Sequence, residues 1–221
     1  VEGESLRERL DRQKQLPIDE AVHHTNAIAS ALDYAHRQGI VHRDIKPENV
    51  MLYEGEAMVM DFGIAKALSG TGTDTLTQTG MMIGTPAYVS PEQAAGATDL
   101  DGSSDQYSLA CMLYEMLSGE RPFTGASPQA VMSKRFTEPP TPVRKIRPNI
   151  PENLERALTK AMSTETTSRY KSIAMFGQAL VSGNVTIEVF GDQREGQKTV
   201  RTGSGVTDLK RFSTIRADRI R

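Results

Sequence analysis

IVHRDIKPENVMLYEGEAMVMDFG, residues 40–63, contains two short apolar runs that are bordered by charged and amide side chains. The runs at 50–52 and 57–60 predict strands, and the polar residues 54–56 between them predict a hairpin turn. A hairpin brings the start of its first strand beside the end of its second. The polar residues that flank the two runs should therefore lie close together at the open end of the hairpin. These residues are Asp44, Lys46, Asn49 and Asp61.

This polar set suits the transfer of a phosphoryl group from a metal-bound nucleotide to a hydroxyl. Such a reaction demands positioning and charge neutralisation more than covalent chemistry. An aspartate can orient the hydroxyl and take its proton, a lysine can balance charge on the moving group, and an amide oxygen with a carboxylate suits magnesium. In that order, the roles fall to Asp44, Lys46, Asn49 and Asp61. The alternative is an ordinary hairpin with solvated charges.

The motifs HRDIKPEN and DFG, in this order and at this separation, resemble those of the eukaryotic-type (Hanks-type) serine/threonine protein kinases, in their bacterial form. The resemblance covers residues 1–182 and implies the C-terminal lobe of that fold, which is mainly α with a small β-hairpin. It also implies ATP and magnesium as cofactors and serine or threonine hydroxyls of protein substrates as acceptors. The implied catalytic residues are Asp44 and Lys46, the implied nucleotide-binding residues are Lys46, Asn49, Met51 and Asp61, and the implied metal ligands are Asn49 and Asp61.

A polar segment at 69–80, SGTGTDTLTQTG, carries threonine at alternate positions among glycines. Its composition predicts a flexible surface loop. The resemblance implies that this is the activation loop and that Arg43, directly before the catalytic aspartate, clamps a phosphate on it. Thr77 and Thr79 match the positions that bacterial members of the family phosphorylate on themselves.

The next stretch, GTPAYVSPE at 84–92, resembles the family's GTxxYxxPE motif, with Ser90 where alanine is commoner. By resemblance, Thr85 contacts the catalytic loop and helps to select a serine or threonine acceptor. Glu92 is implied to be a buried structural acid whose partner is Arg169. Burying either charge alone would be costly, so the two should act as a pair.

Residues 105–118, DQYSLACMLYEMLS, are apolar on nearly every side, which predicts a helix buried in the core. Asp105 is suited to cap its first turn. The resemblance gives Asp105 a further role, which is to hold the backbone of the HRD turn. His23, His24 and His36 have no spaced partners that would make a metal site, so they are interpreted as solvated or capping histidines.

A segment like VEGESLRERL directly follows the hinge between the two lobes in the kinase pattern, so we expect the N-terminal lobe to lie upstream of Val1. The 221 residues contain no glycine-rich GxGxxG turn and no VAIK lysine. We therefore expect them to be inactive alone, because positioning is most of the catalysis. One alternative is a non-catalytic scaffold or regulatory module made from a kinase lobe. Another, a small-molecule phosphotransferase, is disfavoured by the long segment that ends in GTPAYVSPE.

The composition, with 38% hydrophobic and 24% charged residues, is that of a soluble globular protein. No apolar run is long enough to span a bilayer. The single cysteine, Cys111, can form no internal disulfide, which fits the reducing cytoplasm. Residues 1–182 carry 18 basic and 23 acidic side chains, and this mildly acidic balance argues against nucleic-acid binding.

The remaining residues, 183–221, carry eight basic and five acidic side chains. One short strand is expected within NVTIEVFG. The rest of the segment has no regular spacing of hydrophobic residues and is predicted to be a flexible basic tail or linker. An alternative makes it the segment before a membrane anchor that lies beyond Arg221. The chain would then be the cytoplasmic part of a receptor-like kinase.

Overall fold

The computed structural model describes residues 3–62, 86–181, 188–189, 199–202 and 205–208. The chain divides into two compact units, Val1–Leu180 and Val181–Arg221. The sequence boundary after Ser182 stays a prediction. Within the described ranges, no helix combines the length and the apolar character that crossing a membrane requires.

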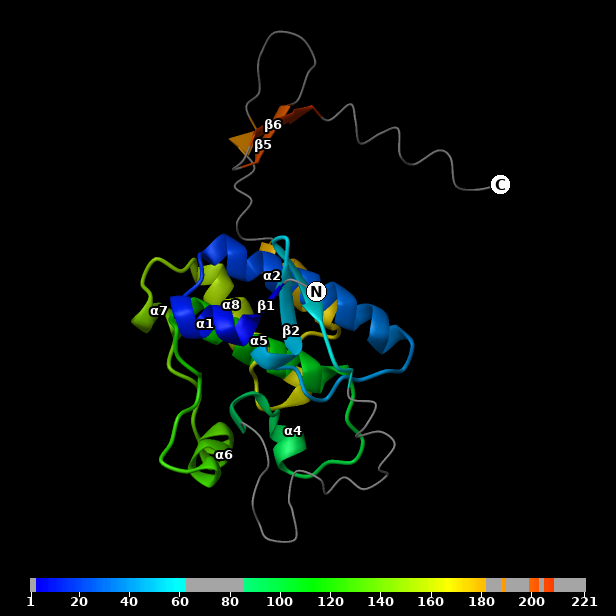
Figure 1. Cartoon of the computed structure of the whole chain (residues 1–221), viewed down its shortest axis with the longest axis vertical. Helices are drawn as coiled ribbons and strands as arrows, with labels where there is room; N and C mark the ends of the chain where they lie inside the picture. Colours follow the sequence, from blue (N-terminus) through cyan, green and yellow to red (C-terminus); the bar gives the residue numbers. More distant parts are fainter. Residues whose placement is uncertain (1–2, 63–85, 182–187, 190–198, 203–204, 209–221) are drawn as a thin grey trace, which may run out of the picture. The chain divides into compact units, whose positions relative to one another are not determined.

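The first unit is mainly helical, as predicted, with one small antiparallel sheet (Figure 1). Its helices are α1 (Leu6–Gln13), α2 (Ile18–Arg37), α4 (Pro91–Ala94), α5 (Gly102–Ser118), α6 (Pro128–Thr137), α7 (Val143–Ile146), α8 (Glu152–Ala161) and α9 (Ile173–Val181). Short 3₁₀ turns form η1 (Pro47–Asn49), η2 (Pro86–Tyr88) and η3 (Thr166–Ser168). The strands are β1 (Glu4–Ser5), β2 (Val50–Tyr53) and β3 (Glu56–Val59).

The sheet has the order β1-β2-β3, so the predicted hairpin is extended by one strand. Met51 of β2 pairs with Met58 of β3 on one side and with Ser5 of β1 on the other. Sequence reasoning missed β1 because two residues are too few to show the alternation of a strand. Its second residue, Ser5, also caps α1, which fixes the helix beside the sheet.

Helix α5 is the centre of the core, with every residue from Ser104 to Ser118 buried. It lies in the middle of the unit and packs against α2, α7 and α8 (Figure 1). The helix begins earlier than predicted, at Gly102, and its cap is Asp101, whose carboxylate accepts the Ser103 N–H at 2.8 Å. Asp105 is therefore not the cap. It lies inside the first turns and is fully buried, and its carboxylate binds the backbone of His42 and Arg43.

The second unit contains an antiparallel sheet in the order β4-β5-β6. Its strands are β4 (Glu188–Val189), β5 (Thr199–Thr202) and β6 (Gly205–Asp208). The expected strand in NVTIEVFG corresponds to β4, but β5 and β6 differ from the expectation of a linker. Both contain neighbouring threonine and valine, β-branched residues that favour strands and were overlooked among the glycines.

Candidate active site

The HRD turn is held in place by the buried carboxylate of Asp105. Its two oxygens accept the backbone N–H of His42 and of Arg43, each at 2.8 Å. The ring of His36, at the end of α2, lies 2.7 Å from the same carboxylate. Arg43 has a φ of 66°, in the left-handed region that non-glycine residues seldom adopt, and these hydrogen bonds stabilise it there.

The predicted catalytic residues meet directly after this turn. The Lys46 Nζ donates to Asp44 Oδ2 at 2.8 Å. The Asn49 side-chain amide donates to the Asp44 carbonyl at 2.8 Å and to its carboxylate at 3.1 Å. The turn η1 begins with Pro47 and folds Asn49 back onto Asp44. The Asp44 carboxylate is thus oriented from two sides.

Asp61 is brought beside Asn49 by the β2–β3 ladder. Beyond the pair Val50–Val59, the Met60 N–H donates to the Asn49 carbonyl at 2.8 Å, and Asp61 is the next residue. Asp61 has a φ of 52°, which turns the chain out of the strand. The His42 ring lies 3.0 Å from the Met60 carbonyl, so this turn is attached to the HRD turn.

The donor atoms in this region fit magnesium. A carboxylate on Asp61 and an amide oxygen on Asn49 are hard oxygen ligands, and Mg²⁺ is commonly held by one or two such groups together with the phosphates of a substrate. In the part of the chain that the structure describes, no group of three or more His, Cys, Asp or Glu side chains could hold a metal.

An apolar surface lies next to these polar groups. Met51 and Met58 pair across β2 and β3, and side chains directly opposite each other lie on the same face of a sheet. Met60 follows two residues after Met58, which puts it on that face by the strand period. Met58 and Met60 are 40% and 42% exposed. The role of Met51 in binding the nucleotide stays a prediction.

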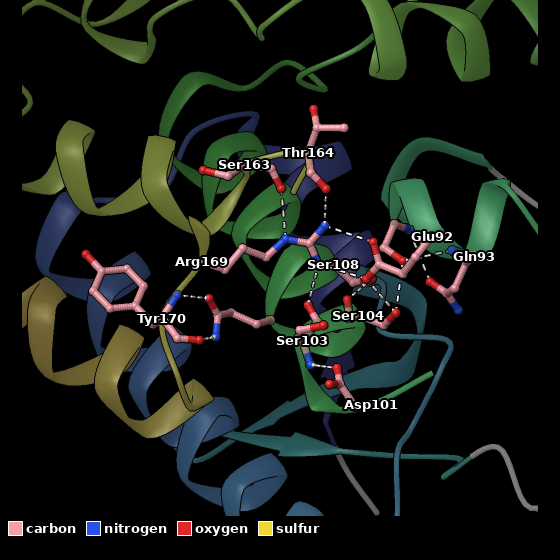
Figure 2. A network of polar contacts seen from close by, with 12 residues as sticks. Glu92, Gln93, Asp101, Ser103, Ser104, Ser108, Ser163, Thr164, Arg169 and Tyr170 are labelled. Atoms are coloured by element: carbon pink, nitrogen blue, oxygen red, sulfur yellow. Dashed lines mark hydrogen bonds and ion pairs between the residues drawn. The ribbon is translucent and has the colours of Figure 1, made fainter. Parts of the chain in front are cut away.

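Glu92 and Arg169 form the paired charges that the sequence implied (Figure 2). Two guanidinium nitrogens of Arg169 each donate to a Glu92 oxygen at 2.8 Å. Three backbone carbonyls accept the remaining donors of Arg169, from Ser163, Thr164 and Ser103. Burial raises the pKa of Glu92, but hydrogen bonds from Arg169 and its positive charge outweigh it and hold the pKa below its ordinary value.

Helix α4 connects this pair to the HRD turn. Ser90 caps α4 in a capping box with Gln93, and its hydroxyl also lies 3.0 Å from that of Ser104. The Gln93 side-chain amide donates to the Arg43 carbonyl at 2.9 Å. The backbone of Arg43 is therefore bound at both its N–H and its carbonyl.

Three predicted site residues, Thr77, Thr79 and Thr85, lie outside the described residues. The proposed role of Arg43 as a phosphate clamp concerns the same loop, so it also stays a prediction. Two histidines differ from their interpretation as solvated or capping groups. His24 is buried in α2, and burial lowers its pKa, whereas His36 contacts Asp105.

A second buried cluster was missed by sequence reasoning. Glu115 of α5 accepts hydrogen bonds from the Tyr88 hydroxyl and, at 2.9 Å, from Arg7 of α1. Burial and the Glu115 carboxylate raise the pKa of Tyr88. One signal was available, because Glu115 is an acid within an otherwise apolar helix and must find a partner there.

Comparison with known proteins shows which family the chain resembles. A sequence profile described as "Protein kinase domain" matches residues 1–179. The chain is 44% identical to a probable serine/threonine-protein kinase of Streptomyces coelicolor and 41% identical to the serine/threonine-protein kinase PknB of Mycolicibacterium smegmatis, over 78% and 79% of its length. It spans 25% and 28% of these relatives.

A solved structure, the crystal structure of Rad53 1-466 in complex with AMP-PNP, has the same fold. It matches with a TM-score of 0.66 and 22% identity, over 81% of this chain and 45% of the other. The profile match, the two relatives and the HRD and DFG motifs of the sequence agree. The chain belongs to the Hanks-type serine/threonine protein kinase family, in its bacterial branch.

Proposed function

We propose that the complete protein containing this chain transfers the γ-phosphoryl group of ATP to serine or threonine hydroxyls of protein substrates. The observation that carries the proposal is the Asp44 carboxylate, which is oriented by Lys46 at 2.8 Å and by Asn49 at 3.1 Å. The printed names of the relatives as serine/threonine-protein kinases support it. Because the chain spans about a quarter of their length, the activity of the whole protein is a proposal.

Each residue of the set has one task in this reaction. Asp44 orients the acceptor hydroxyl and receives its proton, while Lys46 balances negative charge on the moving phosphoryl group. Asn49 and Asp61 would hold magnesium, which supplies charge neutralisation for the phosphates when bound. Met51 and the neighbouring methionines provide an apolar floor for the adenine ring.

The activation loop carries two further proposals. Phosphorylation of Thr77 or Thr79 would add about 1.5 to 2 negative charges, which Arg43 can bind. Thr85 would contact Asp44 and Lys46 and favour serine or threonine acceptors. Mass spectrometry of the protein after incubation with ATP should find phosphate on Thr77 or Thr79. Phosphate confined to other residues would contradict this assignment.

We also propose that residues 1–221 alone bind nucleotide weakly, because their sequence contains no glycine-rich turn to cover the phosphates. Isothermal titration with ATP and magnesium tests this statement directly. Tight binding by the 221 residues would contradict it.

The main experiment compares three variants of the complete protein in a phosphoryl-transfer assay with a serine-containing protein substrate. Asp44→Asn and Asp61→Asn should each abolish transfer while leaving the melting temperature unchanged, because Asp44 is only partly buried and Asp61 is exposed. Asp11→Asn, at a 65% exposed side chain on α1, is the matched control and should remain active. If the wild-type protein transfers no phosphate, or Asp44→Asn stays active, the proposed function is wrong.

A further inference from the structure

Helix α6 buries a charged side chain, that of Arg135. Among the residues of α6, all of which the structure describes, it is the one that is buried, with 1% of its surface exposed. The sequence pattern suggested Ala130 and Val131 as the inward side chains, but both are only partly buried. The inward face of this helix is thus built around a guanidinium group.

The Arg135 guanidinium lies between two aromatic rings and the backbone of η2. Its Cζ is 5.9 Å from the ring centre of Tyr107 and 5.6 Å from that of Phe123. Its Nη2 donates to the Ala87 carbonyl at 3.0 Å. Aromatic faces attract a cation, and a guanidinium is flat enough to stack on them while it donates hydrogen bonds in its plane.

The segment that Arg135 binds is also fixed from the side of α5. The Ser108 hydroxyl donates to the Tyr88 carbonyl at 2.8 Å, and the Tyr88 hydroxyl donates to Glu115. Consecutive carbonyls of η2 are thus bound by two different helices. Helix α6 packs against η2 and α4, and Figure 1 shows it beside α4.

Burying a guanidinium costs free energy, and an apolar side chain of the same size would fill this position with less penalty. The hydrogen bond from its Nη2 to the Ala87 carbonyl is a contact that an apolar side chain could not make. Ala87 follows Thr85 by two residues, and Thr85 is proposed to contact Asp44 and Lys46 and to favour serine or threonine acceptors. A shift of η2 would move the acceptor-binding segment relative to Asp44.

We infer that Arg135 is a positioning residue that fixes η2 for binding of the protein substrate. The inference rests on the proposed function, since it concerns the acceptor side of the same reaction. It predicts a specific kinetic effect. Loss of the guanidinium should weaken binding of the acceptor and leave nucleotide binding unchanged, because η2 packs mainly against α5 and α6, whereas Asn49 and Met51 belong to η1 and β2.

The first experiment measures backbone hydrogen exchange in the 221-residue chain and needs no activity. Arg135→Met keeps an unbranched apolar side chain and removes the hydrogen-bond donors, and Lys134→Met on the same helix is the control. Exchange of the peptide that covers residues 86–90 should accelerate in Arg135→Met only, while exchange in α2 stays as in the wild type. Unchanged exchange at 86–90 would overturn the inference.

The second experiment measures the KM for an acceptor peptide and the KM for ATP in the complete protein. Arg135→Met should raise the acceptor KM about tenfold, the effect of losing one hydrogen bond from a charged donor, with the ATP KM unchanged. Arg135→Lys, which keeps the charge, should restore part of the loss and replaces Arg135→Met if that variant does not fold. Equal changes in both KM values would refute the inference. An inactive wild type would instead refute the proposed function.

Discussion

Asp105 and Arg43 are 62 residues apart in sequence, yet the Asp105 carboxylate accepts the Arg43 backbone N–H at 2.8 Å. The same carboxylate binds the N–H of His42 and the ring of His36. The left-handed conformation of Arg43, directly before the proposed catalytic residue Asp44, is therefore imposed by the central helix rather than by the local sequence. The HRD turn depends on the integrity of α5.

Asp105→Asn should destabilise the first unit by about 1–3 kcal/mol, because one carboxylate oxygen becomes an amide nitrogen and a buried N–H loses its acceptor. Urea unfolding of the 221-residue chain measures this change. Asp101→Asn is the matched control, since asparagine caps a helix as well as aspartate does. Equal stability of the two variants would show that the Asp105 contacts contribute little.

Arg169→Ala should cost about 3–5 kcal/mol of stability, because it leaves the Glu92 carboxylate without its ion pair in a largely buried site. The exposed pair Arg156–Glu152, with side chains 71% and 66% exposed, provides the control. Arg156→Ala should change stability by less than about 1 kcal/mol. Urea unfolding of both variants compares the two losses of stability. An unchanged urea midpoint for Arg169→Ala would show that the Glu92–Arg169 pair does not stabilise the fold.

The Glu92–Arg169 pair also predicts a pH dependence. The pKa of Glu92 is lower in the folded protein than its ordinary value of 4.5. The unfolded state then binds the proton first, so the contribution of Glu92 is complete above pH 4.5 and is lost as the pH falls through the folded pKa. Melting temperatures of wild type and Glu92→Gln should converge as the pH decreases from 5 to 3. A constant difference over this range would contradict the lowered pKa.

Cys111 should be chemically inert in the folded protein. It lies fully buried in α5, and burial raises the pKa of its thiol to about 12, so the reactive thiolate is scarce at neutral pH. Iodoacetamide at pH 8 should leave the native chain unlabelled and should label one site after unfolding in urea. Rapid labelling of the native protein would show that α5 opens readily.

The sequence allowed the hairpin and the meeting of Asp44, Lys46 and Asn49 to be predicted because their signals are local. The hairpin that carries Asn49 and Asp61 follows from two apolar runs and a polar turn, and a ladder of known geometry then places the side chains. The partners of Asp105 and Glu92 came from the family resemblance. Composition alone would have shown only that buried charges need partners.

The features that sequence reasoning missed depend on distant contacts. Arg135 and Ala87 are 48 residues apart, and Arg7 and Glu115 are 108 apart. An arginine on a short helix is normally expected to face solvent. It does not contribute to a hydrophobic pattern, so the sequence gives no sign that it is buried. The start of α5 was misplaced for a related reason, since Asp101 and Asp105 both resemble caps and only packing separates their roles.

The ion pair between Glu92 and Arg169 also constrains the order in which the chain assembles. The two residues are 77 positions apart, and closing so long a loop costs more conformational entropy than forming the contacts within α1, α2 and the hairpin. During synthesis, Glu92 leaves the ribosome long before Arg169 exists, and its carboxylate must stay hydrated until almost the entire lobe has been made. The pair is thus a late contact, and we expect it to slow unfolding far more than it speeds folding.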